Sequence, residues 1–177
     1  MSKLKPPLQE TDHYFGNPAS PLQLLEFGDF QCPHCGAAYP ILERIKKKYG
    51  TRMVFIFRHF PLSKSHPYAQ LAAIVSEAAA RQGKFWEMYN LIFENQTGMN
   101  RQHLFGLAKT LPLDMPRFEK DVADPALSKT VEANFESGII SGVNGTPSFY
   151  INGEKYNGPY DFDSLSEALE QRMAFPG

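Results

Sequence analysis

The two cysteines of the chain stand two residues apart, in the tetrapeptide Cys32-Pro33-His34-Cys35. The chain has no other cysteine, so any internal disulfide must join these two. A disulfide stabilises a fold mainly by restricting the unfolded chain, and a loop this short restricts it little. An inert structural disulfide is therefore a weak explanation for the pair. The spacing instead favours a redox-active or metal-binding site.

The residues around the tetrapeptide predict a strand, a turn and a helix. Residues 22–27 are mostly apolar, as in a buried strand, and apolar residues recur at helical spacing from 38 to 49. Pro33 suits the first helical turn, where its missing N–H removes a donor that would have no partner. Gly50 fits the end of the helix. We therefore expect Cys32 at a helix N-terminus.

A cysteine at that position should be reactive. Unpaired N–H groups and the helix dipole stabilise the thiolate, which is the form that attacks a disulfide or leaves it. Cys35 should lie one turn further on, where it can donate a hydrogen bond to Cys32 or attack a mixed disulfide formed there. His34 adds a hydrogen-bond donor and, when protonated, a positive charge, and both lower the pKa of Cys32. The motif predicts a nucleophilic Cys32 and a resolving Cys35.

A zinc site is one alternative, in which His34, His59 or His66 would complete the ligand set. Structural zinc usually takes four ligands from two closely spaced pairs, and the sequence has no second Cys/His pair with such spacing. The sequence suggests no partner for His13 or His103. We therefore expect no metal ligands.

No bound cofactor is expected either, because the chain lacks a Gly-x-Gly-x-x-Gly motif and a phosphate loop. The redox group would be the Cys32–Cys35 disulfide itself. Electrons would then pass to or from another thiol protein or glutathione.

A second motif lies far downstream, in Gly145-Thr146-Pro147-Ser148-Phe149. Together with Gly28-Asp29-Phe30-Gln31 and the tetrapeptide that follows it, this motif resembles the DsbA-like branch of the thioredoxin superfamily. The resemblance covers nearly the whole chain. It implies an α/β thioredoxin fold, with a central mixed β-sheet flanked by helices and an all-helical insertion between the βαβ and ββα halves. It also implies a bacterial thiol:disulfide oxidoreductase.

The resemblance assigns a role to Thr146 and Pro147. Their peptide bond should be cis and lie beside the sulfur of Cys32, where the Thr146 backbone can pair with an extended substrate strand. The best-known member of the family has valine at the position of Thr146, so the hydroxyl departs from its pattern.

Glu26 lies inside the apolar strand, six residues before Cys32. Without the resemblance it could be a carboxylate that faces solvent. The family has a buried acidic residue here, whose raised pKa would let it exchange protons with Cys35. Arg58 on the next strand is the predicted charge partner of Glu26. Asp29 is expected to be only a turn residue.

Length and composition favour one domain, 1–177, with residues 62–142 as a helical insertion within it. The chain is 42% hydrophobic and 21% charged, and no Gly/Ser linker bounds the insertion. The patterns predict strands at 22–27 and 53–60, helices over 67–82, 84–94, 100–111 and 125–142 with a short one from 115, a hairpin of 148–151 and 155–156, and a last helix over 163–173.

A formal net charge of −1 argues against nucleic-acid partners. No segment approaches the roughly 20 apolar residues that span a bilayer, and the first residues lack the apolar core of a secretory signal. We expect a monomer without membrane insertion, cytoplasmic as the sequence stands and periplasmic if a signal sequence has been lost. Its partners should be cysteine-containing polypeptides and a thiol or membrane protein that recycles it.

The motif does not determine the direction of electron flow. A stabilised Cys32 thiolate favours the reduced form, so the disulfide form would be an oxidant. We therefore favour a DsbA-like oxidase that transfers its disulfide to protein thiols. A cytosolic disulfide reductase or isomerase on the same scaffold, and a peptide-binding or chaperone module without redox turnover, are the alternatives.

Overall fold

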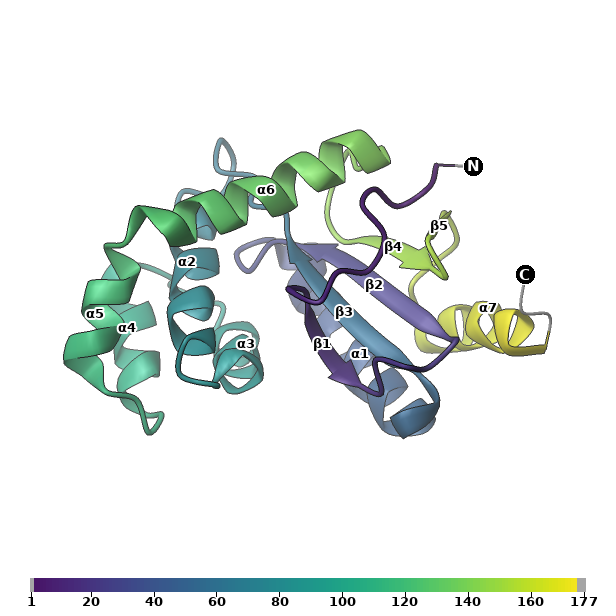
Figure 1. The fold of residues 1–177 in the computed structure, drawn as a ribbon, viewed down its shortest axis with the longest axis horizontal. Coiled ribbons are helices and arrows are strands. Elements are labelled where there is room, and N and C mark those ends of the chain that lie inside the picture. The colour runs from purple at the N-terminus through teal and green to yellow at the C-terminus, as the bar shows by residue number, and fades with distance from the viewer. Residues whose placement is uncertain (1, 175–177) are drawn as a thin grey trace.

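A mixed β-sheet forms the centre of the computed structural model, which describes residues 2–174 (Figure 1). Strands β2 and β3 are parallel, and the other neighbouring pairs are antiparallel. A parallel pair needs a crossover connection, which α1 provides. In spatial order the strands are β1 (His13–Gly16), β3 (Val54–His59), β2 (Gln23–Gly28), β4 (Ser148–Ile151) and β5 (Glu154–Tyr156).

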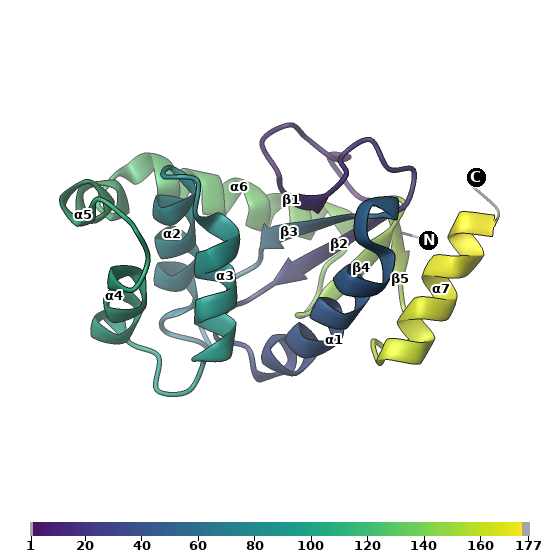
Figure 2. The ribbon, with the colours of Figure 1, turned by 90° about the horizontal axis from the view of Figure 1, so that it is seen from below.

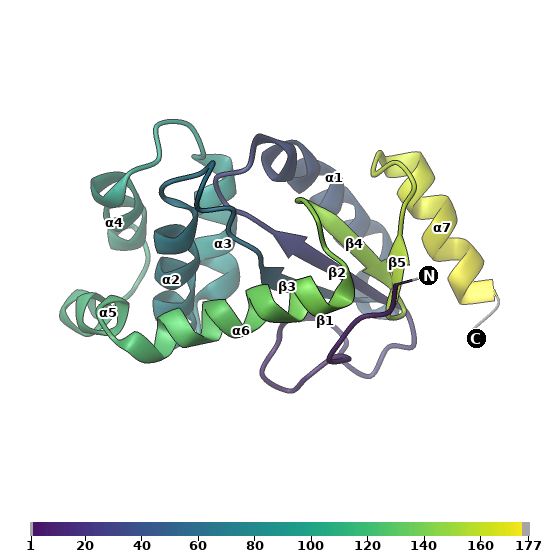
Figure 3. The same ribbon diagram turned by 90° about the horizontal axis from the view of Figure 1, so that it is seen from above.

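Helices cover both faces of the sheet. Seen from below, α1 lies in front of the sheet with α7 beside it (Figure 2), and seen from above α6 lies in front (Figure 3). Helices α2 to α5 form a block beside the sheet (Figure 1). The bounds are α1 (Pro33–Tyr49), α2 (Ala69–Ala80), α3 (Phe85–Glu94), α4 (Arg101–Lys109), α5 (Met115–Val122), α6 (Pro125–Ser141) and α7 (Phe162–Ala174), with a 3-10 turn over Gly50–Arg52.

The sheet divides the hydrophobic core in two. Side chains alternate between the faces along each strand, so Leu24 joins the larger cluster with α1, α3 and α7, while Leu25 and Phe27 join the smaller one beside α6. On β3, Phe55 likewise lies on the α1 side and Ile56 on the α6 side. Both central strands are almost wholly buried, which explains their nearly continuous apolar sequence.

The predicted α/β order of βαβ, helices and ββα is confirmed, and so are most element boundaries. The side chains of Asn100, Asp114 and Asp124 accept hydrogen bonds from helix N–H groups as N-caps. Asn152 and Gly153 both have positive φ, at 49° and 78°, as the tight turn between β4 and β5 requires.

The edge strand β1 was not predicted. Three of its four residues are exposed, so it lacks the apolar alternation that marks a half-buried strand. It is held by antiparallel pairing with β3, in which His13 lies opposite Phe57. Within residues 2–174, no helix has the length and apolar character needed to cross a bilayer.

Candidate active site

Cys32 is the N-cap residue of α1, as the position of Pro33 predicted. Its backbone is extended, with φ −70° and ψ 123°, and Pro33 occupies the first turn. The thiol of Cys32 donates to the carbonyl oxygen of Thr146 over 3.5 Å. Both cysteines are free thiols in this structure, and Cys32 is only 3% exposed while Cys35 is fully buried. A reacting sulfur must therefore approach Cys32, because Cys35 is covered.

The two thiols have opposite pKa shifts. The pKa of Cys32 is lowered from 9.0 to about 5, chiefly because the Cys35 thiol donates a hydrogen bond to the Cys32 thiolate. The side chain of Thr146 and the backbone N–H groups of His34 and Cys35 add to this stabilisation and outweigh the effect of burial. Burial raises the pKa of Cys35 well above its ordinary value. At neutral pH Cys32 is a thiolate and Cys35 is a protonated thiol.

Thr146 faces the reactive sulfur with two polar groups. Its carbonyl accepts from the Cys32 thiol, and its hydroxyl is buried without a hydrogen-bond partner among the described residues. The hydroxyl is therefore available to the thiolate. The peptide bond between Thr146 and Pro147 is cis, and the strand β4 begins directly after Pro147.

Glu26 is fully buried on β2, and neither of its carboxylate oxygens has a hydrogen-bond partner in the described residues. Burial raises its pKa from 4.5 to about 8, although the charge of Lys46 opposes this shift. The charge of Glu26 in turn raises the pKa of Cys35. A carboxyl group that titrates near neutral pH and interacts with the resolving thiol is suited to exchanging protons with it.

Lys46 of α1 is the cation that acts on Glu26. Its side chain is 5% exposed, pairs with Glu43, and lies over the rings of Trp86 and Tyr89, with its nitrogen 5.3 Å from each ring centroid. Aromatic rings thus line the buried position of this ammonium group, where they interact favourably with a cation.

The predicted pairing of Arg58 with Glu26 is wrong. Glu26 lies opposite Phe57 in the sheet, and Phe27 lies opposite Arg58. Because neighbouring residues of a strand face opposite sides, the side chain of Arg58 points away from Glu26. Its guanidinium binds both carboxylate oxygens of Asp12 at 2.7 Å.

Asp29 has a larger role than that of a turn residue. Its carboxylate is buried and accepts from the N–H of Leu62 at 2.9 Å and from His66 Nδ1 at 2.7 Å. Its backbone carbonyl accepts from Cys32 N at 3.1 Å, and its backbone N–H donates to Cys35 Sγ at 3.4 Å. Asp29 thus connects the loop after β3 to both cysteines. The sequence contains no signal for these long-range contacts.

Gln96, in the loop after α3, also holds the start of α1. Its side-chain amide donates to the carbonyls of Phe30 and Cys32 at 2.9 and 2.8 Å. A Cβ atom at Gly36 would lie 2.2 Å from the Gln96 side-chain oxygen, so a glycine is needed for this approach. The helical block therefore helps to position the nucleophile.

The histidines of the alternative zinc site do not gather around the thiols. His34 is exposed, and its ring has no hydrogen bond within the described part of the chain. His59 lies against Glu77, and His66 lies against Asp29. Within residues 2–174, one group of histidine, cysteine or acidic side chains lies close enough together to share a metal ion. It consists of His13, His59 and Glu77 and contains no cysteine.

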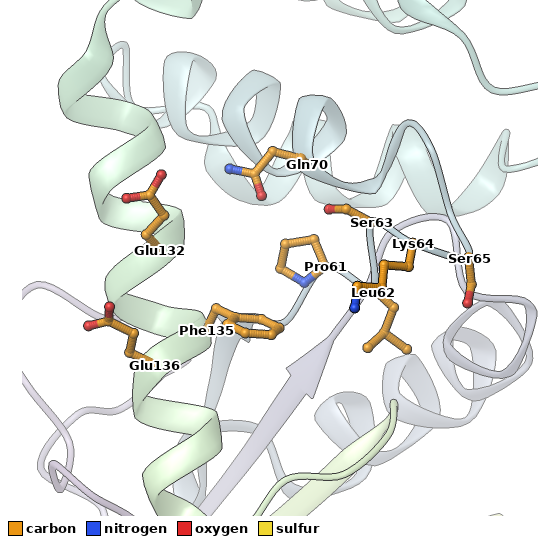
Figure 4. Close-up of a pocket in the computed structure, with 9 residues that line it drawn as sticks. All are labelled: Pro61, Leu62, Ser63, Lys64, Ser65, Gln70, Glu132, Phe135 and Glu136. Atoms are coloured by element: carbon orange, nitrogen blue, oxygen red, sulfur yellow. The ribbon is translucent and has the colours of Figure 1, made fainter.

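A groove of about 690 Å³ lies between the loop after β3 and helix α6 (Figure 4). Pro61, Leu62 and Phe135 provide apolar surface, while Glu132 and Glu136 project from α6 on one side. The backbone of Leu62 also contacts Asp29. The groove thus borders the loop that is tied to the two cysteines.

A pair of thiols at a helix N-terminus, on this mixed sheet and beside the cis Thr146–Pro147 bond, is the arrangement of the thioredoxin superfamily. Residues 8–171 match the family Thioredoxin_4, described as thioredoxin, and the chain belongs to this family.

Solved structures show the same fold. BdbD from Bacillus subtilis is 22% identical, with a TM-score of 0.81 over 92% of this chain and 93% of that chain. The thiol-disulfide exchange protein alpha-DsbA2 from Wolbachia pipientis is 20% identical, with a TM-score of 0.82 over 92% of this chain and 88% of that one.

Curated relatives of higher identity carry the name of an ion transporter. The chain is 38% identical over 165 residues to the Na(+)/H(+) antiporter NhaA 3 of Salinispora tropica, covering 93% of this chain and 25% of that protein. It is 36% identical over 168 residues to NhaA of Herminiimonas arsenicoxydans, covering 94% of this chain and 27% of that one. The chain thus spans about a quarter of the length of these relatives, and their name describes the whole proteins.

Proposed function

We propose that the chain is a thiol:disulfide oxidoreductase that works as an oxidase, donating its Cys32–Cys35 disulfide to protein thiols. The observation that carries this proposal is the opposite shift of the two thiol pKa values, with that of Cys32 at about 5. A stable Cys32 thiolate is a good leaving group and favours the reduced enzyme, so the oxidised enzyme gives up its disulfide readily.

The reaction has two exchange steps. A substrate thiolate attacks Cys32 Sγ, which forms a mixed disulfide, breaks the Cys32–Cys35 bond and releases Cys35 as a thiolate that takes up a proton. A second substrate thiolate then attacks the substrate sulfur of the mixed disulfide and releases Cys32 as a thiolate. The substrate loses two electrons and gains a disulfide, and the enzyme gains those electrons as its dithiol.

Glu26 would supply the proton that Cys35 needs. With a pKa of about 8 it is mostly protonated at neutral pH, and it interacts with Cys35. The released thiolate of Cys35 has a pKa well above its ordinary value, so it takes a proton readily. Glu26 then acts as a general acid in this step and as a base when the enzyme is reoxidised.

The substrates would be cysteine-containing polypeptides. Thr146 beside Cys32 offers a backbone carbonyl to an extended chain, and the groove of Pro61, Leu62 and Phe135 offers apolar surface nearby. A thiol or membrane redox protein would reoxidise the enzyme. An oxidase needs a compartment in which thiols are not kept reduced, so this function fits the periplasm better than the cytosol.

The test is a reaction of the oxidised protein with a reduced peptide that contains two cysteines, followed by mass spectrometry. We expect one peptide disulfide per enzyme disulfide. Cys32→Ser should be inactive. Cys35→Ser, first activated by a small disulfide, should form a lasting mixed disulfide with a control peptide that contains one cysteine, because neither Cys35 nor a second substrate thiol is present to resolve it. Peptide oxidation by Cys32→Ser at the wild-type rate contradicts the mechanism. Rapid reduction of a disulfide peptide by the dithiol, without peptide oxidation, would assign the chain to the reductases.

A further inference from the structure

Two histidines and a glutamate that the redox mechanism does not use converge at one point. His13 on β1 and His59 on β3 each place Nε2 2.7 Å from the same oxygen, Oε1 of Glu77 on α2. The three potential ligand atoms all lie within 4.8 Å of one another. Three separate elements of the fold therefore supply an N₂O ligand set.

This cluster carries a buried negative charge. The side chain of Glu77 is 8% exposed and that of His59 is 1% exposed. Each imidazole places a ring nitrogen within hydrogen-bond distance of the same oxygen of the Glu77 carboxylate. Within residues 2–174, its ion-pair partners are these two histidines, with no Lys or Arg among them. A buried carboxylate calls for a cation, which can be a proton on an imidazole or a metal ion.

The ligands are held in place before any ion binds. The residues next to His13 and His59 along the chain, Asp12 and Arg58, form a buried pair through two 2.7 Å hydrogen bonds. Phe85 stacks on the ring of His13 with 3.6 Å between centroids. The His13 side chain is 20% exposed, which leaves a path from solvent to its edge of the cluster.

We propose that His13, His59 and Glu77 bind a divalent transition metal, specifically Zn²⁺, at a site separate from the redox thiols. Imidazole and carboxylate are ligands that suit Zn²⁺. At metal–ligand distances of roughly 2.0–2.2 Å, the ligand atoms of a tetrahedral site lie about 3.4 Å apart. Small side-chain rotations would open the present 2.7 Å spacing to that value. Water can take the fourth position from the exposed edge of His13.

We expect modest affinity. His59 Nδ1 is buried without a hydrogen-bond partner in the described residues. Zinc on Nε2 would place the ring proton on Nδ1, where an acceptor is lacking. Since such outer partners typically change metal affinity by about 10–100-fold, zinc should bind more weakly by about this factor than at a site whose histidines both have an acceptor for the second ring nitrogen.

The experiment must exclude zinc binding by the thiols, so it uses the oxidised protein and, separately, the Cys32→Ser/Cys35→Ser protein. Each is titrated with Zn²⁺ by calorimetry, and with Co²⁺ while the visible absorption that reports ligand geometry is recorded. We expect one equivalent of Zn²⁺. His13→Gln keeps a hydrogen-bond donor toward Glu77 but loses the ligand, and should bind at least about tenfold more weakly.

The matched control is His103→Gln. The ring of His103 forms an exposed hydrogen bond with the carbonyl of Asn95 and is not part of the cluster, so zinc binding should be unchanged. Absence of zinc binding by the oxidised wild-type protein overturns the proposal, as does equal binding by wild type and His13→Gln. Either result would leave the cluster as a proton-sharing network. The result is independent of the proposed oxidase activity, because the thiols are blocked or replaced.

Discussion

The carboxylate of Asp29 accepts a hydrogen bond from His66 Nδ1 at 2.7 Å, although 37 residues separate the two in the chain. Asp29 stands three residues before Cys32 and contacts both cysteines through its backbone. The loop after β3, which carries His66 and lines the groove at Leu62, is thereby fastened to the reactive site. A substitution in this loop should therefore affect the two thiols through Asp29.

Replacement of Asp29 tests this connection. Asp29→Ala removes the acceptor of two partly buried donors, the N–H of Leu62 and the ring nitrogen of His66, and an unsatisfied buried group costs about 1–3 kcal/mol. We expect the free energy of unfolding to fall by about 2–4 kcal/mol in urea, and less for Asp29→Asn, whose amide oxygen still accepts. Wild-type stability of Asp29→Ala would show that the contacts contribute little.

Gly36→Ala tests whether Gln96 holds the start of α1. The new methyl group would lie 2.2 Å from the Gln96 oxygen, so that side chain must move and give up its hydrogen bonds to Phe30 and Cys32. We expect a loss of about 1–2 kcal/mol in urea unfolding. Gly106→Ala is the matched control, because it is also helical and its methyl group meets no atom within 4 Å. The control should gain about 0.5–1 kcal/mol. Equal gains in both variants would contradict the role of Gln96.

The depressed pKa of Cys32 predicts how stability depends on pH. Between pH 5 and 9.0 the folded reduced protein holds a thiolate at Cys32, whereas the unfolded chain holds a thiol and so binds one more proton. This contribution to stability is full above pH 9.0 and is lost as pH falls toward 5. The stability of the reduced protein relative to Cys32→Ser should therefore increase with pH across this range. A constant difference in urea unfolding would contradict a thiolate pKa of about 5.

Glu26 should show the opposite dependence. Its pKa is raised from 4.5 to about 8 by burial, so stability is lost as pH rises through this interval. The free energy of unfolding of Glu26→Gln, relative to that of wild type, should increase by on the order of 4 kcal/mol between pH 4.5 and about 8. The variant should also oxidise the dithiol peptide about 10–100-fold more slowly, because proton transfer to Cys35 is lost.

A matched control for Glu26→Gln is Glu10→Gln, at an exposed position. It should leave both the pH dependence and the exchange rate unchanged. If Glu26→Gln behaves like this control in both measurements, Glu26 is neither the buried acid nor the proton donor.

Local rules predicted the elements that they govern. Some features depend only on residues that are neighbours in the sequence, and the structure has each one that was predicted. They are Pro33 in the first turn after Cys32, the helix caps Asn100 and Asp124, and the turn at residues 152–153. The face of the sheet on which Arg58 lies depends on the pairing of β2 with β3, which the sequence does not show.

Sequence and resemblance identified Cys32, Cys35, Thr146 and Glu26, which the structure brings together through direct contacts or charge. The links of Asp29 to the loop after β3 were missed, because they join segments far apart in the chain. The same holds for the amide of Gln96, which reaches back 64 residues to the carbonyl of Cys32.

The most direct test of the central claim is the reduction potential of the Cys32–Cys35 pair. The protein is equilibrated in glutathione buffers, and the oxidised fraction is read by mass spectrometry after alkylation. Because the Cys32 thiolate is strongly stabilised, we predict a potential closer to the roughly −120 mV of DsbA than to the roughly −270 mV of thioredoxin. A value near that of thioredoxin would contradict the oxidase and assign the chain to the reductases.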